Sequence, residues 1–331
     1  MLWAMTVALV ALSACTNKAT TTTPASETST QPKLKGVVTF DADSAYAFIQ
    51  TQVDMGPRVP GTEGSRKCAR WIADKLRQYG ADSIIEQSFK AKAHTGDTYN
   101  LTNVMGRFGA PNKPRVLLVA HYDTRPWADR DRNSENADKP IPGANDGASG
   151  VGVLLELARQ LQVKRPDIAV DMLFVDGEDM GKSDGWTNTD STWCLGTQYW
   201  TEHMPADYRM MPPAYGILLD MVGSPSARFM REFISERYAP SILDKVWQIA
   251  EASGYGNYFI NKAGGSVIDD HLFINIGAGI PTIDIIDCNN AETGTFPAPW
   301  HTMADDMSGI DPSTLRAVGQ TVSNVIYRER P

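Results

Sequence analysis

Carboxylate and imidazole side chains lie in this sequence at points where apolar runs end. Asp146 precedes an amphipathic helical pattern, and the adjacent pair Glu178 and Asp179 directly follows an apolar run. His301 lies on a late loop. Ligands of open α/β sheets bind beyond the carboxyl ends of the strands, so we expect these side chains to converge on one crevice. Mixed nitrogen and oxygen ligands suit zinc, and the pattern therefore predicts a zinc site.

Each acidic or imidazole residue also has an ordinary structural explanation. Asp146 could cap its helix, Asp179 could be a surface carboxylate, and His121 could be a satisfied polar residue at the end of a strand. Asp220 follows a further apolar run in the same way. Repetition of this placement at several strand ends favours a shared site over several unrelated structural roles.

The elements that must position these residues alternate along the chain. Short apolar runs rich in β-branched residues, typical of strands covered on both faces, are 116–120, 169–175, 217–219 and 282–286. Helical spacing of apolar residues is found at 65–79, at 151–161 and after Asp311-Pro312. This alternation predicts an α/β protein, a three-layer α/β/α sandwich with a mostly parallel central sheet.

Length and charge limit the possible functions. The chain has 331 residues, and residues 37–331 fit a single catalytic domain with ample apolar residues for a core. The formal net charge is -8, and the 31 Lys and Arg residues form no long run. We therefore expect no nucleic-acid partner.

The N-terminal segment predicts where the protein resides. Residues 1–14 are mostly apolar but too short to span a bilayer, and they end at Cys15 in a sequence that resembles a bacterial lipoprotein box. The resemblance implies a signal peptide at 1–14, lipidation of Cys15 and membrane attachment through this lipid anchor only. Residues 15–36 are rich in Thr, Ser, Pro and Ala and predict a flexible tether. The expected location is the periplasm or cell envelope, although a soluble protein with an apolar N-terminus is an alternative.

Three further cysteines, Cys68, Cys194 and Cys288, lie within the expected domain. An odd number allows at most one disulfide among them, and their wide separation does not suggest a metal cluster. Buried thiols are the simpler expectation for at least one of them.

Six short motifs give the sequence a resemblance to the zinc aminopeptidase-like fold of peptidase family M28, over roughly residues 40–325. They are His121-Tyr122-Asp123, Asn145-Asp146-Gly147-Ala148-Ser149-Gly150, Asp176-Gly177-Glu178-Asp179, Asp220-Met221-Val222-Gly223, Asp269-Asp270-His271 and His301-Thr302. The resemblance implies that Glu178 acts as general acid and base and that Asp179 binds metal. Asp179 replaces the more usual Glu, so its shorter side chain must bring the backbone or the metal closer.

Two branches of this family differ in their metal content. Aminopeptidases hold two zinc ions, for which His121, Asp146, Asp179, Asp220 and His301 would supply all protein positions. Glutaminyl cyclases use one zinc ion per chain, for which the resemblance implies Asp146, Asp179 and His301 as ligands. The ligand inventory alone therefore leaves both branches open.

Aromatic residues favour the cyclase branch. Trp300 directly precedes His301, and a Trp at this place is typical of the cyclases, where it shapes a pocket for a glutamine side chain. A buried core aromatic is the ordinary alternative for this Trp. Trp186 is expected to form a second pocket wall, with Trp193 as the competing candidate.

The resemblance implies cyclisation of an N-terminal glutamine of a peptide or protein to pyroglutamate, with release of ammonia. Zinc would act as a Lewis acid on the side-chain carbonyl, while Glu178 would move a proton from the α-amine to the leaving nitrogen. Asp220 and Asp270 would share hydrogen bonds and orient the amine. The alternatives are a di-zinc aminopeptidase and a lipid-tethered binding protein that has lost catalysis.

Overall fold

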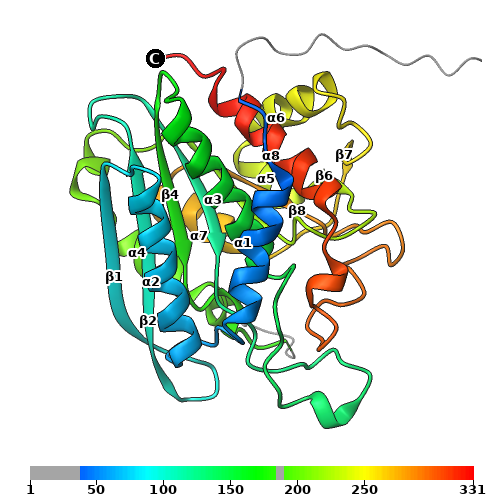
Figure 1. Ribbon diagram of the computed structural model, residues 1–331. Coiled ribbons are helices and arrows are strands. Elements are labelled where there is room, and N and C mark those ends of the chain that lie inside the picture. The colour runs from blue at the N-terminus through cyan, green and yellow to red at the C-terminus, as the bar shows by residue number, and fades with distance from the viewer. Residues whose placement is uncertain (1–37, 184–189) are drawn as a thin grey trace, which may run out of the picture. The chain divides into compact units, whose positions relative to one another are not determined.

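The computed structural model describes residues 38–183 and 190–331, and its centre is a six-stranded sheet in the order β1-β2-β4-β3-β5-β8 (Figure 1). The strands are β1 (Ser83–Lys92), β2 (Thr98–Phe108), β3 (Arg115–His121), β4 (Ala169–Val175), β5 (Tyr215–Asp220) and β8 (Thr282–Ile286). Strands β4, β3, β5 and β8 are parallel, and β1 and β2 add an antiparallel edge. The predicted mostly parallel sheet is confirmed.

Helices cover both faces of this sheet. Those packed in the larger apolar cluster are α1 (Ala42–Asp54), α2 (Glu63–Gln78), α3 (Ala148–Val163), α6 (Pro240–Ala252) and α8 (Pro312–Ile326). On the opposite face lie α4 (Leu195–Glu202), α7 (Asp270–Phe273) and the short π-helix Ile274–Ala278. Alternate residues of β3 follow this division, because Leu118 packs in the first cluster and Leu117 in the second. The architecture is therefore the expected three-layer α/β/α sandwich.

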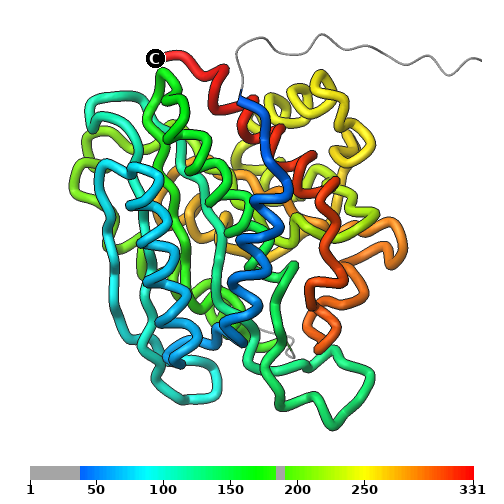
Figure 2. Tube along the Cα trace, viewed as in Figure 1, coloured from blue at the N-terminus to red at the C-terminus, as the bar shows by residue number. Residues whose placement is uncertain are grey.

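Elements distant in the sequence meet in the larger helical layer. Helix α1, near the start of the described chain, and α8, near its end, both pack beside α3 (Figure 2). Asp311 caps α8 by accepting a hydrogen bond from the Ser313 amide, and Pro312 occupies the first turn, as the sequence indicated. The smaller elements are α5 (Phe233–Tyr238) and the parallel pair β6 (Phe229–Arg231) and β7 (Phe259–Ala263).

The parallel strands direct several polar residues to one edge of the sheet. His121 ends β3, Asp220 ends β5, and Glu178 and Asp179 follow β4 after the turn at Gly177. The Gly177 backbone has φ of +74°, a left-handed conformation that glycine adopts without steric cost. The carboxyl ends of β3, β4 and β5 therefore present their polar side chains to a common crevice.

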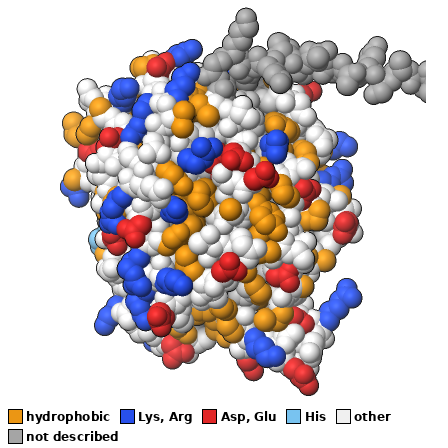
Figure 3. Space-filling view, in the orientation of Figure 1, with side chains coloured by type: hydrophobic (Ala, Val, Ile, Leu, Met, Phe, Trp, Pro, Cys, Tyr) orange, Lys and Arg blue, Asp and Glu red, His pale blue; other side chains and the backbone are white. Residues whose placement is uncertain are grey.

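The molecular surface carries mixed charge. On the face drawn in Figure 3, Lys and Arg side chains are interspersed with Asp and Glu side chains. Among the helices of the described residues, none combines the length and apolar character needed to cross a bilayer.

Candidate metal centre and active site

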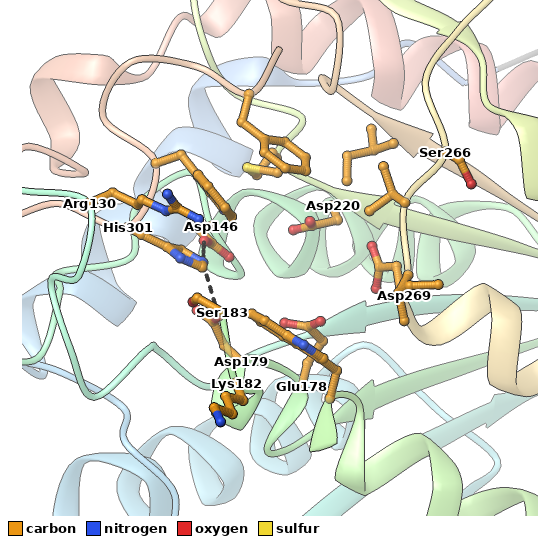
Figure 4. A pocket seen from close by; sticks show the side chains of 17 residues that line it. Arg130, Asp146, Glu178, Asp179, Lys182, Ser183, Asp220, Ser266, Asp269 and His301 are labelled. Carbon is orange, nitrogen blue, oxygen red and sulfur yellow. Dashed lines mark ion pairs between the residues drawn. The ribbon is translucent and has the colours of Figure 1, made fainter. Parts of the chain in front are cut away.

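Three side chains from three separate segments converge as potential metal ligands. The ligand atoms of Asp146, Asp179 and His301 all lie within 4.8 Å of one another. His301 Nε2 is 3.1 Å from Asp179 Oδ1 and 3.5 Å from Asp146 Oδ2 (Figure 4). The Oδ2 atoms of Asp146 and Asp179 are buried and accept no hydrogen bond. Because an unsatisfied buried oxygen is costly, these residues fit a cation, and their imidazole and carboxylate donors suit zinc.

A neighbouring carboxylate orients the His301 ring. Asp129 Oδ1 lies 3.4 Å from His301 Nδ1, which leaves Nε2 to face Asp146 and Asp179. Asp129 also accepts hydrogen bonds of 2.9 and 2.7 Å from Arg125. Burial alone would raise the pKa of Asp129, but the neighbouring His301 imidazole and the hydrogen bonds from Arg125 outweigh it and hold that pKa well below its usual range. This is the carboxylate-histidine arrangement that fixes ligand orientation in metal sites.

Asp123 holds the backbone that carries the acidic pair. Its Oδ1 accepts the Glu178 amide and its Oδ2 accepts the Asp179 amide, each at 3.1 Å. Asp123 is itself completely buried. The two carboxylates after β4 are therefore fixed by a side chain that follows β3.

Asp305 plays the same part for the Asp146 segment, and sequence reasoning did not identify it. Its two oxygens accept the amides of Asn145 at 2.8 Å and Asp146 at 3.0 Å. Burial raises the pKa of Asp305 to about 7, with the charge of Asp146 adding to this effect. Asp305 lies on a late loop, and its carboxylate contacts the backbone of the Asp146 segment, so no sequence motif identifies it.

His121 lies between the carboxylates that a second metal ion would need. Its Nε2 is 3.1 Å from Asp220 Oδ1 and 3.2 Å from Asp146 Oδ1, and its Nδ1 is 3.3 Å from Asp123 Oδ1. Burial would lower the pKa of His121, but the three carboxylates outweigh it and raise that pKa well above its usual value. A protonated imidazole donates from both nitrogens, so in that state His121 would itself supply positive charge at this position.

A cavity of about 280 Å³ opens beside these residues. Its wall includes three acidic side chains, Glu178, Asp220 and Asp269, and three aromatic side chains, Trp193, Phe296 and Trp300. The Trp300 ring stacks on His301 at a centroid distance of 3.8 Å and contacts Phe296 at 4.4 Å. Trp300 is thus a wall of the cavity in contact with a candidate ligand.

Glu178 is 8% exposed and faces this cavity. Burial raises its pKa well above the usual glutamate range, and the nearby Asp269 adds to this effect while His121 opposes it. The Cys194 thiol donates a hydrogen bond of 3.5 Å to Glu178 Oε1. A carboxyl group in this environment keeps its proton to higher pH than an exposed glutamate does, and it can serve as a general acid and base.

Comparison with known proteins identifies the family. The sequence profile of peptidase family M28 matches residues 103–326. The chain belongs to peptidase family M28. Its relatives include glutaminyl-peptide cyclotransferase of Bos taurus, which is 26% identical over 78% of this chain and 74% of the relative.

Solved structures of similar proteins carry two kinds of name. Bacteroides thetaiotaomicron glutaminyl cyclase bound to N-acetylhistamine is 46% identical, with a TM-score of 0.84 over 89% of this chain and 100% of that chain. A Zn-dependent exopeptidase from Parabacteroides distasonis is 43% identical, with a TM-score of 0.83 over 88% of this chain and 100% of that chain. The M28 assignment and these neighbours support the zinc aminopeptidase-like fold and a zinc-dependent enzyme.

One residue assignment drawn from the M28 motifs needs correction. Asp269, rather than Asp270, lines the cavity with Asp220. Asp269 has an extended backbone with φ of -151° and ψ of 176°, so its side chain and that of Asp270 point in different directions. Asp270 is completely buried at the start of α7, and burial raises its pKa to about 6. Asp269 therefore takes the position beside Asp220 that was expected of Asp270.

The expected aromatic wall at Trp186 lies outside the described residues. Trp193, the competing candidate, lines the cavity and stacks on His301 at 6.2 Å. A side chain at Gly181 would collide with the Trp193 indole, because a Cβ there would lie 1.8 Å from the ring. Gly181 is therefore required for this placement of Trp193.

The three cysteines of the domain, Cys68, Cys194 and Cys288, are buried free thiols. Cys15, the predicted lipidation site, lies outside the described residues.

Proposed function

We propose that this protein is a zinc-dependent glutaminyl-peptide cyclotransferase that converts N-terminal glutamine of peptides and proteins to pyroglutamate. The observation that carries the proposal is the cavity lined both by Trp300, which stacks on His301, and by the carboxyl groups of Glu178, Asp220 and Asp269. The indole offers a flat apolar surface to a glutamine side chain, and the carboxylates offer acceptors to its α-amine. The glutaminyl cyclase of Bacteroides thetaiotaomicron is similar to this protein over the whole of its own chain, and this similarity supports the same activity.

We further propose one zinc ion per chain, held by Asp146, Asp179 and His301. Two buried oxygens of this set accept no hydrogen bond, Oδ2 of Asp146 and Oδ2 of Asp179, and they support a cation there. Ion pairs to the histidine occur in both sets, at 3.1 and 3.5 Å from His301 and at 3.1 and 3.2 Å from His121, but Asp220 of the alternative set has no buried oxygen without a hydrogen bond. Because His121 forms ion pairs with Asp220 and with Oδ1 of Asp146, these carboxylates do not need a second metal ion.

The chain's own residues account for the proton transfers. Zinc bound at the ligand set would polarise the side-chain amide carbonyl as a Lewis acid. Asp220 and Asp269 accept hydrogen bonds from the α-amine and direct it toward that carbonyl carbon. Glu178 takes a proton from the attacking amine and returns it to the leaving nitrogen. One carbon-nitrogen bond forms, the side-chain carbon-nitrogen bond breaks, and ammonia leaves.

An M28 aminopeptidase is the second candidate function. All five residues that a di-zinc centre would use are present, and one similar structure bears the name Zn-dependent exopeptidase. In that reaction water would attack the peptide carbonyl, so Glu178 would activate water instead of the substrate amine. The two functions therefore differ in the nucleophile that reaches the carbonyl. A binding protein without catalysis would have no need for the buried proton-carrying group at Glu178.

Two amidated peptides, one starting with Gln and one with Leu, distinguish these functions. We expect the Gln peptide to lose about 17 Da and release ammonia while the Leu peptide stays intact. Release of free leucine would establish the aminopeptidase and reject the cyclase. Elemental analysis of the same sample should give one zinc per chain, and two would contradict the proposed ligand assignment.

We also propose that Cys15 anchors the protein in the cell envelope through attached lipid, with the active domain in the periplasm or at the surface. The apolar segment 1–14 and the polar segment 15–36 support this placement. Cys15→Ala should move the protein from the membrane fraction to the soluble fraction. Mass spectrometry of the N-terminal peptide should find acyl chains on Cys15, and an unmodified Cys15 in the mature protein would refute the anchor.

A further inference from the structure

Two cationic side chains, Arg130 and Lys182, line the cavity at its exposed rim. Figure 4 shows both on the side of Asp179 and His301, away from Asp269. The chain as a whole has a formal net charge of -8, so the pair of cations at this rim is opposite in sign to the overall charge.

Arg130 is held close to the candidate metal centre. Its backbone amide donates a hydrogen bond of 3.2 Å to the His301 carbonyl, and its guanidinium carbon lies 5.5 Å from the centroid of the Trp300 ring. A guanidinium over an indole is favourably placed and keeps its hydrogen-bond donors available to other groups. Arg130 therefore presents its donors beside the wall that the substrate would contact.

Neither cation has an ionic partner among the residues that the structure describes, because the nearby carboxylates serve other groups. Asp129 accepts hydrogen bonds from Arg125 and Ser183. The two oxygens of Asp131 accept backbone amides, one from Asn133 and one from Met303. The charges of Arg130 and Lys182 are left for a ligand.

The cavity consequently has acidic side chains at one end and two cationic side chains at the other. Glu178, Asp220 and Asp269 lie where the α-amine of the substrate would bind, and the two exposed cations lie where the following residues of the peptide would extend. A peptide that carries a positive amine at its first residue and a carboxylate shortly after it matches this distribution.

We propose that Arg130 and Lys182 select substrates that have an aspartate or glutamate at the second or third position, directly after the N-terminal glutamine. This charge preference rests on the proposed cyclase function and specifies its substrate class. An exposed ion pair changes binding by about 1.4- to 5-fold, and repulsion of a lysine has a similar size. We therefore expect kcat/KM for a glutamate-containing peptide to exceed that for the matching lysine-containing peptide by about tenfold.

The experiment uses three amidated tripeptides that begin with Gln and differ only in a second residue of Glu, Gln or Lys. Their kcat/KM values are compared for the wild type, Arg130→Gln, Lys182→Gln and the double variant. Lys113→Gln removes an exposed charge at the opposite edge of the sheet, next to β3, and serves as the matched control. Ratios between peptides are compared within each variant, so a general loss of activity cancels.

The wild type and the control should favour Glu over Lys, and 0.5 M salt should reduce the preference because exposed charges are screened. The double variant should bring the ratio close to one. Equal kcat/KM values in the wild type, or an unchanged ratio in the double variant, would overturn the preference while cyclisation itself still stood. Failure to cyclise all three peptides would instead reject the proposed function and the preference with it.

Discussion

Replacing Asp123 by asparagine tests whether one buried carboxylate organises the active site. Asp123 accepts the amides of Glu178 and Asp179 with separate oxygens, and His121 Nδ1 lies 3.3 Å from Oδ1. Asparagine has almost the same shape but only one acceptor oxygen. In Asp123→Asn its NH₂ group must face at least one of these donors.

The magnitude follows from those contacts. One buried amide loses its acceptor, which costs about 1–3 kcal/mol, and the remaining hydrogen bonds lose the strengthening effect of the charge, which adds about 1 kcal/mol. The expected destabilisation is therefore about 2–4 kcal/mol. A domain of about 290 described residues has an unfolding entropy near 0.6 kcal/mol/K, so Tm should fall by about 3–7 °C. Displacement of Asp179 should also weaken zinc binding by about 10- to 100-fold.

Thermal unfolding with a chelator present measures the first effect, and a zinc titration against a competing chelator measures the second. Asp311→Asn is the matched control, because Asp311 caps α8 with one oxygen at the exposed Ser313 amide and asparagine caps equally well. Its Tm should stay within about 1 °C of the wild type. A wild-type Tm together with unchanged zinc affinity in Asp123→Asn would refute the organising role of this carboxylate.

Three further predictions concern residues around the same cavity. Glu178→Gln should leave the protein folded and zinc-loaded but lower the cyclisation rate at least about a hundredfold, and activity within a few-fold of wild type would reject its role as acid and base. Asp146→Ala and His301→Ala should each lose zinc along with activity, whereas stoichiometric zinc by elemental analysis would show that the ligands were misassigned. Cys194→Ala should lower kcat with little change in KM or Tm, because the thiol hydrogen bond positions Glu178. Cys194→Ser should restore most of the rate. Equal kcat values for the Ala and Ser variants would show that the hydrogen bond has no such effect.

Central elements of the fold could be predicted because their sequences are uniformly apolar. Strands β4 and β8 have the predicted bounds, and β3 and β5 extend the predicted runs by one or two residues at each end. The hairpin of β1 and β2 was not predicted. Strand β1 lies at the sheet edge with most of its residues exposed or half-buried, so charged residues such as Glu86 and Lys90 interrupt its apolar pattern.

Site residues could be predicted where they follow the end of a strand. They could not be predicted where they only hold the backbone of other site residues. The strand-end rule identified Glu178, Asp179 and Asp220. It could not choose between Asp269 and Asp270, because two adjacent identical residues give the same pattern and only the backbone conformation separates their directions. Asp305 escaped notice for a different reason: its role is to accept backbone amides from a segment about 160 positions away in the sequence.

The charges around the cavity limit what can bind there. Five buried carboxylates, Asp146, Glu178, Asp179, Asp220 and Asp269, surround one small space. Because gathering ionised carboxylates away from water is costly, such a group must be balanced by protons or cations. A metal ion at Asp146 and Asp179 would balance these two carboxylates, and a protonated His121 would add one positive charge beside Asp220. A substrate with a protonated α-amine brings a further positive charge. Glu178 can accept a proton from that amine when the amine attacks the carbonyl carbon. The same balance does not favour a blocked N-terminus, which would place a neutral amide among the carboxylates and leave them without a cation.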